Sequence, residues 1–286
     1  MVSAHMNHLI ETFLNRLARA PAVLVRVAST QGSVPRETGS WMAVFAGTEV
    51  GSIGGGHLEY EAIAMARAQL QQPPSEDDTG ANAGHRFALG PALGQCCGGV
   101  VQLQFERVSA RDLPALAAGL QQAHEKSLCP LALFGGGHVG HALVRVLASL
   151  PFALTWIDSR DGVFPAHLPP GVVCEHSDPV QAAVRSLAAQ SRVLIMSFSH
   201  AEDLDVVAAC LLRQRERADL PYIGLIGSKT KWATFKHRLE ARGFMPAELA
   251  HVTSPIGVPG VKGKEPEVIA VAVAAQLLQI IAPETK

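Results

Sequence analysis

Two adjacent cysteines are the residues of this chain whose type and spacing most clearly suit chemistry. Cys96 and Cys97 lie in the segment Leu-Gly-Gln-Cys-Cys-Gly-Gly, residues 93–99, so glycines flank the pair. Adjacent thiols close a disulfide only through a strained ring, whereas two soft thiolates can bind a thiophilic metal or its sulfur ligands. Free cysteines also pack as small buried hydrophobic residues, and that alternative stays open. The glycines favour a site, with Cys97 and Cys96 as metal ligands.

A glycine-rich turn in the second half of the chain has the spacing of a nucleotide-binding loop. Gly135, Gly137 and Gly140 fit G-x-G-x-x-G, with a hydrophobic strand before them and a helix after them. Such glycines let a pyrophosphate approach the helix N–H groups, and an acidic residue about 20 positions further on, here Asp158, holds a ribose hydroxyl. We predict a Rossmann unit with these four residues and His138 as cofactor contacts. NAD(P) is a candidate ligand, although such a fold can be kept while its ligand changes.

Two further segments combine free backbone amides with polar side chains. Gly55, Gly56 and His57 open a predicted helix, and either an anionic ligand or simple capping accounts for the glycines. Ser228 and Lys229 join a later strand to a helix, where they suit either a phosphate or an N-cap with a solvated lysine. We include all five residues among the candidate cofactor contacts.

A dehydrogenase also needs a proton donor. Neither of the two tyrosines precedes a lysine in the Tyr-x-x-x-Lys pattern of short-chain reductases. His200 and Asp203 follow a predicted strand and can supply an acid/base pair, because the carboxyl end of a parallel strand favours a functional site. The first turn of a helix explains Asp203 equally well.

The composition excludes several classes of protein. The 286 residues carry a net charge of −1, so the sequence lacks the excess positive charge that binds nucleic acid or an anionic membrane. No apolar run reaches the roughly 20 residues of a membrane helix, and no signal peptide is visible. The five cysteines do not form the pattern of a secreted disulfide framework. We therefore expect a soluble, cytoplasmic protein without a nucleic-acid or membrane partner.

The order of predicted elements gives an α/β fold class, with an N-terminal α+β domain followed by a Rossmann-like parallel-sheet domain. Residues 1–107 form the α+β domain with the cysteine pair, 108–128 a helical connector, and 129–286 the Rossmann-like domain. In the last of these, apolar one-piece strands alternate with helices, which indicates a parallel sheet covered on both faces. The predicted strands of this domain occupy residues 131–134, 153–157, 172–174, 192–197 and 222–226, and the predicted helices between them include 139–150, 179–189 and 203–217.

Several strings, spread in order over nearly the whole chain, resemble those of the XdhC/CoxI family of xanthine dehydrogenase accessory proteins. They are Gly32-Ser-Val-Pro-Arg-Glu37, Gly51 through Glu59, Leu93 through Gly99, Leu133 through Gly140, Ile223 through Lys229, and Ser254-Pro-Ile-Gly through Lys264-Glu-Pro. Within them, Cys97 matches the cysteine of the family's Cys-Gly-Gly motif, and Cys96 matches the extra cysteine of the xanthine dehydrogenase branch. Phe198 departs from the pattern, which has a histidine there, so a metal or catalytic role for its loop is in doubt.

The resemblance implies a chaperone rather than an enzyme. Such proteins bind the molybdenum cofactor in its molybdopterin form, support its sulfuration by a cysteine desulfurase, and insert it into apo-xanthine dehydrogenase. The Rossmann half then contributes to the pterin and phosphate site, and we expect a homodimer. Two alternatives remain at this point: an NAD(P)-dependent oxidoreductase that uses Gly135–Gly140, Asp158 and His200, and a thiol protein that carries zinc or copper.

Overall fold

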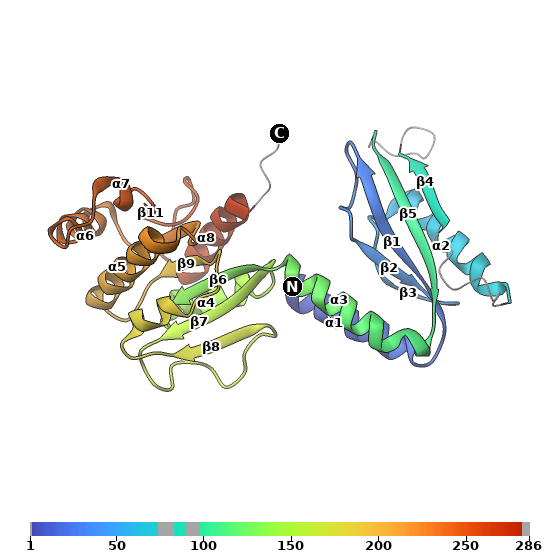
Figure 1. The fold of residues 1–286 in the computed structure, drawn as a ribbon, viewed down its shortest axis with the longest axis horizontal. Helices are drawn as coiled ribbons and strands as arrows, with labels where there is room; N and C mark the ends of the chain where they lie inside the picture. Colours follow the sequence, from blue (N-terminus) through green and yellow to red (C-terminus); the bar gives the residue numbers. More distant parts are fainter. Residues whose placement is uncertain (1, 74–82, 90–97, 282–286) are drawn as a thin grey trace. The chain divides into compact units, whose positions relative to one another are not determined.

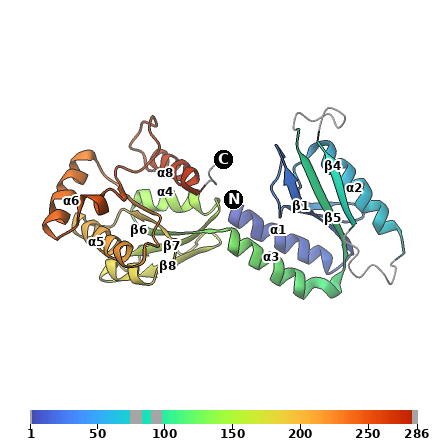
Figure 2. The ribbon, with the colours of Figure 1, turned by 45° about the horizontal axis from the view of Figure 1, so that its top comes forward.

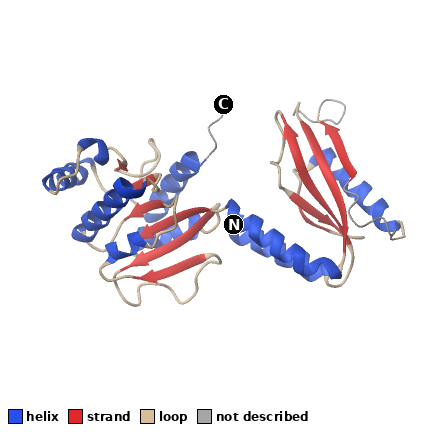
Figure 3. Cartoon of the chain, in the orientation of Figure 1, coloured by secondary structure: helices blue, strands red, loops and turns tan. Residues whose placement is uncertain are grey.

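The chain folds into two compact units, each built on its own β-sheet. The computed structural model describes residues 2–73, 83–89 and 98–281. The units comprise residues 7–122, and residues 123–286 together with 1–6. The first sheet is antiparallel and the second parallel (Figures 1 and 3), which confirms the predicted α+β domain followed by a Rossmann-like domain. The predicted boundaries at residues 107 and 128 stay predictions.

The first unit contains a five-stranded antiparallel sheet in the order β3-β2-β1-β5-β4. Its strands are β1 (Ala22–Gln31), β2 (Trp41–Val44), β3 (Glu49–Gly51), β4 (Ala83–Ala88) and β5 (Val100–Val108). β1 pairs with β5 along nearly its whole length, from Ala22 opposite Val108 to Gln31 opposite Val100. The far end of this central pair therefore brings residue 31 beside the start of β5, directly after the cysteine segment.

Helices cover both faces of this sheet. Helix α2 (Gly56–Gln71) buries Leu58, Ala62 and Ala66 against one face, in a cluster with apolar side chains of β1, β2 and β5. Helix α1 (Val2–Leu17) uses the other face, where the ring of Phe13 lies 5.5 Å from that of Trp41. A 3₁₀ turn, η3 (Ala110–Asp112), leads from β5 into α3 (Leu113–Ser127), which runs beside α1 (Figures 1 and 2).

The second unit contains a six-stranded sheet in which every pair is parallel, in the order β11-β10-β9-β6-β7-β8. Its strands are β6 (Cys129–Phe134), β7 (Phe152–Asp158), β8 (Val172–His176), β9 (Arg192–Ile195), β10 (Tyr222–Leu225) and β11 (Val252–Thr253). Counted from β6, this is the 3-2-1-4-5-6 order of a Rossmann fold, whose ligands bind where the order reverses, beyond the carboxyl ends of β6 and β9.

Helices lie on both faces of this parallel sheet as well. On one face, α4 (His138–Leu147) packs with α8 (Pro266–Ile281) over β6, β7 and β9 (Figure 2). The other face is covered by η4 (Val180–Arg185), α5 (His200–Arg217), α6 (Lys229–Ala241) and α7 (Pro246–Leu249). Among the described helices, none combines the length and apolarity needed to cross a membrane.

Two of the differences between the structure and the predicted elements have a clear physical reason. The helix expected over 179–189 is the shorter 3₁₀ turn η4, in which the i, i+3 spacing brings Val180 and Ala183 onto the buried side together. The sequence pattern does not predict β11, because a two-residue strand has no periodicity and is defined only by its pairing with β10.

The close packing of α4 against the preceding turn gives a stability prediction. A Cβ atom added to Gly140 would lie 2.1 Å from the carbonyl oxygen of Gly135, a backbone atom that cannot easily move. Gly140→Ala should therefore lower the free energy of unfolding by about 1–3 kcal/mol. Gly119→Ala in α3, where an added Cβ meets nothing within 4 Å, is the matched control and should be neutral or stabilising. Urea denaturation of both variants checks this, and equal effects would contradict it.

Candidate functional site

The glycine-rich turn after β6 is held by close backbone contacts. Gly135 adopts φ +123°, and a Cβ atom there would lie 2.0 Å from the carbonyl oxygen of Met196 at the end of β9. Its N–H donates to the carbonyl of Ile157 at 2.8 Å, and its own carbonyl accepts from the indole N–H of Trp156 at 2.9 Å. Only glycine fits this position, so the turn is fixed to β7 and β9.

Gly137 differs from Gly135 and Gly140 in this turn. It is the N-cap of α4 with an ordinary φ of −79°, and a Cβ atom there would meet nothing within 4 Å. Gly137 and His138 are both exposed at the carboxyl edge of the sheet. The packing of the described residues therefore does not require a glycine at position 137, and the space in front of this helix start is open.

The carboxylate of Asp158, at the end of β7, is buried and hydrogen-bonded on both oxygens. Oδ2 accepts from the N–H of Gly136 at 2.5 Å and from Nη2 of Arg160 at 2.9 Å, while Oδ1 accepts from the N–H and Nε of Arg160, each at 2.9 Å. Burial alone raises the pKa of Asp158, but the hydrogen bonds from Arg160 and Gly136 and the guanidinium charge outweigh it and lower the pKa.

The guanidinium of Arg160 is stacked on an aromatic ring from the neighbouring loop. Its Cζ lies 4.5 Å from the ring centroid of Phe198, which follows β9. Glu202, in the first turn of α5, accepts from the Ser159 hydroxyl at 2.8 Å and from the N–H of Phe198 at 3.1 Å. The loops after β7 and β9 are therefore tied together through Arg160 and Glu202, and Phe198 supplies the stacking surface.

Asp203 forms an ion pair, but not with the histidine that the sequence suggested. Its Oδ2 accepts from Nζ of Lys231 at 2.6 Å and its Oδ1 from the N–H of Ser197 at 2.7 Å. His200 is exposed, and its ring centroid is 6.3 Å from that of Phe235. The expected acid/base pair of His200 and Asp203 is not formed, because a lysine from the next strand–helix connection reaches the carboxylate instead.

Ser228 and Lys229 follow β10 at the same carboxyl edge of the sheet. The Ser228 hydroxyl accepts from the N–H of Lys231 at 3.2 Å as the N-cap of α6, and Lys229 is exposed. The structure thus supports the capping interpretation of Ser228, and the phosphate contact remains a prediction.

In the first unit, the turn before α2 is filled by a carboxylate of the chain itself. Oε2 of Glu59 accepts from the Ser52 hydroxyl at 2.6 Å and from the N–H groups of Ile53 at 2.9 Å and Gly55 at 3.1 Å. Gly56 and His57 are exposed, and Nε2 of His57 lies 3.0 Å from a carboxylate oxygen of Glu61. An anionic ligand predicted at Gly55, Gly56 and His57 would have to compete with Glu59.

The loop after β1 packs against two glycine-rich segments. A Cβ atom on Gly99 would lie 2.3 Å from the carbonyl oxygen of Ser33, and one on Gly54 would lie 2.7 Å from the ring of Pro35. The N–H of Leu89 donates to the carbonyl of Gly99 at 2.8 Å. Cys96 and Cys97 lie outside the described residues, but these contacts fix the two chain positions from which their segment leaves and to which it returns.

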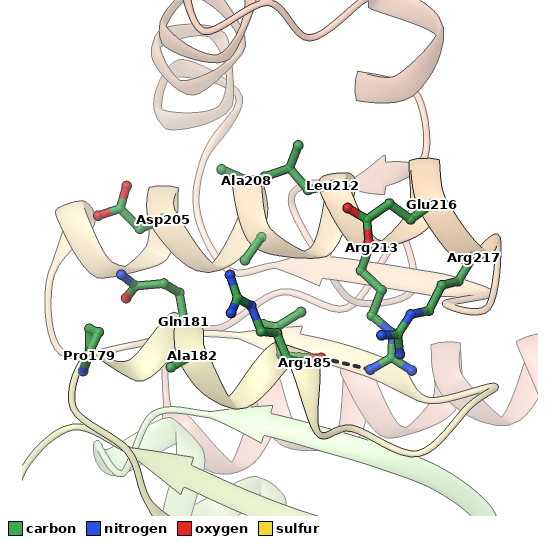
Figure 4. Close-up of a pocket in the computed structure, with 12 residues that line it drawn as sticks. Pro179, Gln181, Ala182, Arg185, Asp205, Ala208, Leu212, Arg213, Glu216 and Arg217 are labelled. Carbon is green, nitrogen blue, oxygen red and sulfur yellow. Dashed lines mark hydrogen bonds between the residues drawn. The ribbon is translucent and has the colours of Figure 1, made fainter.

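Elsewhere, the described residues contain no group of three or more histidine, cysteine or acidic side chains placed to hold a metal ion. A groove of about 600 Å³ lies between η4 and α5 (Figure 4). Ala182 and Arg185 line it from the η4 side, and Ala208 and Arg217 line it from α5. None of the predicted residues that the structure describes lines this groove.

Sequence reasoning missed Arg160, Glu202 and Lys231. Arg160 carried a usable signal, since it follows Asp158 by two positions and can fold back onto that carboxylate. Lys231 lies two residues after Lys229, but nothing in the sequence indicates which lysine turns toward α5. That choice depends on the position of Asp203 across the sheet edge.

The Asp158–Arg160 pair makes a pH-dependent prediction. Asp158→Asn should lower the free energy of unfolding by about 1.5–3 kcal/mol at neutral pH, because it removes charge-assisted hydrogen bonds. The pKa of Asp158 is lowered in the folded state, so its stabilisation is complete above the unfolded pKa near 3.9 and is lost as the pH falls through the folded value. Urea titrations should show a constant difference from pH 8 to 5 that shrinks below about pH 4.

Asp205→Asn is the matched control for that experiment. Asp205 pairs with Arg242 at 2.8 Å, but the two side chains are 42% and 46% exposed. Asp205→Asn should therefore lower the free energy of unfolding by about 1 kcal/mol or less. A cost for Asp158→Asn no larger than for this control would contradict the structural role of Asp158.

Comparisons with known proteins bear on both units. A family model described as the XdhC Rossmann domain matches residues 131–277, and a model of the XdhC and CoxI family matches residues 16–76. The Escherichia coli K12 protein YqeB, described as uncharacterized, is 24% identical over 261 residues, which are 91% of this chain and 43% of YqeB. The chain therefore spans less than half the length of that curated relative.

A solved structure from Bacillus halodurans, described as a xanthine dehydrogenase, has a similar fold. It matches with a TM-score of 0.73 at 20% identity, over 98% of this chain and 96% of its own. At this identity the likeness shows the fold alone. Because one model matches more than half of the chain, over residues 131–277, and a second matches residues 16–76, the chain belongs to the XdhC and CoxI family.

Proposed function

We propose that this protein is an accessory protein that matures xanthine dehydrogenase in the cytoplasm rather than a catalyst. Its cargo is the molybdenum cofactor in the molybdopterin form, which it protects and delivers to apo-xanthine dehydrogenase. A partner cysteine desulfurase supplies the terminal sulfido ligand. Membership of the XdhC and CoxI family supports this role, and the arrangement at the end of the antiparallel sheet supports the assignment of the cargo site.

The observation that carries the assignment is the meeting of three segments at one end of that sheet. Ser33 and Pro35, in the loop after β1, contact Gly99 and Gly54 respectively. Gly99 follows Cys97 by two residues, so the cysteine pair is joined directly to this packed backbone. The loop after β1 and two glycine-rich segments, all far apart in the sequence, therefore meet beside the point where the cysteine segment joins β5.

The chemistry of the pair suits a molybdenum and sulfur cargo. Thiolates are soft ligands for a thiophilic centre, and an exposed low-pKa thiol can hold or shield a labile sulfido group. Cys97 is the principal contact and Cys96 assists it. By contrast, Cys210 in α5 is fully buried, and burial raises the pKa of its thiol to about 12, so it is unsuited to this role.

The Rossmann unit supplies a second set of contacts in this proposal. Gly137 leaves the start of α4 open, and its neighbour His138 is exposed beside it. N–H groups at a helix start favour an anion, so the phosphate of the pterin is the group that fits here. The protein acts as a homodimer, in which each copy carries one cargo.

Cargo analysis of cysteine variants tests the proposal. The protein is co-produced with the cofactor pathway, and its molybdenum and pterin contents are measured. Cys97→Ala should lower both by about tenfold or more, as expected for loss of a metal contact, and Cys96→Ala should lower them less. Cys174→Ala, which removes a half-buried thiol of β8, is the matched control and should leave them unchanged.

The same samples are then added to apo-xanthine dehydrogenase. Wild-type protein and Cys174→Ala should activate it, and Cys97→Ala should not. Retention of molybdenum and of activation by Cys97→Ala would show that Cys97 is not the principal contact. Zinc or copper without pterin in the wild-type protein would instead favour metal trafficking.

A further inference from the structure

Asp158, the carboxylate at the position that holds a ribose in dinucleotide-binding Rossmann units, has no acceptor capacity left. An ionised carboxylate offers about four acceptor positions, two on each oxygen. In Asp158, the N–H of Gly136 and three N–H groups of Arg160 occupy all four, at 2.5–2.9 Å. A ribose diol would need two of these positions, so it can bind Asp158 only if Arg160 leaves.

Arg160 is held in place from its other sides as well. The ring of Phe198 covers one face of the guanidinium at 4.5 Å, and this cation–π contact adds to the ion pair. Glu202 fixes both ends of the contact through the Ser159 hydroxyl and the N–H of Phe198. Displacing Arg160 would therefore break contacts to two loops at once.

The backbone beside Asp158 is covered too. A Cβ atom on Gly136 would lie 2.6 Å from Cγ2 of Val163, which shows that the loop after β7 folds back onto the glycine turn. Nε2 of His176 lies 3.0 Å from the carbonyl oxygen of Ser159 and holds the same loop from β8. The loop after β7 therefore covers the backbone beside Asp158.

The positive charge of Arg160 does not make a 2′-phosphate site either. Its guanidinium is already neutralised by Asp158, and the carboxylate of Glu202 is close enough to raise the pKa of Arg160 further. With Asp158 and Glu202 both near Arg160, the surroundings of the guanidinium carry no net positive charge. A 2′-phosphate would need such a charge to bind.

We propose that Arg160 determines the ligand specificity of the Rossmann unit: by occupying Asp158, it excludes ligands that are held through a ribose diol. The excluded class comprises nucleotides such as NAD(H) and ADP. This inference concerns the β7 and β9 loops only and does not depend on the cargo proposed for the cysteine pair.

Nucleotide titration by calorimetry at pH 8 tests the proposal without any molybdenum. The probes are 5′-ADP, its 2′-deoxy form and 2′,5′-ADP. In the wild-type protein, 5′-ADP and 2′-deoxy-ADP should bind equally weakly or not at all, because the diol finds no acceptor. Arg160→Ala should bind 5′-ADP about tenfold more tightly than 2′-deoxy-ADP, since the freed carboxylate can accept from the diol.

Arg145→Ala is the matched control, because Arg145 forms an exposed ion pair with Glu267 on α4 and α8. It should leave all three affinities unchanged. A tenfold preference of the wild-type protein for 5′-ADP over the deoxy form would overturn the proposal, as would a folded Arg160→Ala protein without diol preference. Tighter binding of 2′,5′-ADP that is lost in Arg160→Ala would also overturn it.

The comparison of 5′-ADP with 2′-deoxy-ADP in the wild-type protein needs no variant, so it tests the proposal even if Arg160→Ala is unstable. Phe198→Ala offers a milder change, because it removes the stacking surface and keeps the ion pair. It should show a smaller diol preference than Arg160→Ala, and a larger one would contradict the dominance of the ion pair over the stacking contact. Loss of molybdenum binding by Cys97→Ala has no bearing on either result.

Discussion

The carboxyl edge of the parallel sheet depends on how closely Gly135 approaches the end of β9. An added Cβ at Gly135 would lie 2.0 Å from the carbonyl oxygen of Met196, so no other residue allows β6 and β9 to end side by side in this way. The carbonyl of Gly135 in turn accepts from Trp156 and lies under Gly140 of α4. One turn therefore sets the positions of β7, β9 and α4, and with them Asp158 and Phe198.

The two Gly-Gly-Gly-His strings, at 54–57 and 135–138, show how each unit satisfies the amides of such a turn. In the first, Glu59 accepts from the turn that leads into α2, and in the second, Asp158 accepts from Gly136. Turns that expose several N–H groups attract anions, and in both units a carboxylate of the chain supplies the negative charge. The same local arrangement is therefore present in an antiparallel unit and in a parallel unit, although the sequences that flank the two strings do not match.

Much of the fold follows from local patterns, whereas the site depends on contacts across the sheet. One-piece apolar strands and the glycine motif predict the Rossmann unit. The partner of Asp203 could not be predicted in this way, because Lys231 is 28 residues away and reaches it only after β9 and β10 pair. The stacking of Phe198 on Arg160 joins two loops for the same reason. The cysteine pair remains a sequence prediction, since it lies outside the described residues.

Packing within the fold explains why most residues of the glycine motif have the type they have. Gly135 is required by its φ and by Met196, Gly140 by the carbonyl of Gly135, and Asp158 by the N–H of Gly136. A motif that suggests nucleotide binding in the sequence is therefore largely accounted for by packing, in keeping with a fold that persists while its ligand changes.

Gly137 is the exception in this motif, because its φ is ordinary and an added Cβ would meet no neighbour. In dinucleotide-binding units, this second glycine lets a phosphate approach the helix start. An edge that is open at Gly137 and closed at Asp158 fits a phosphate ester without a ribose diol better than it fits a nucleotide.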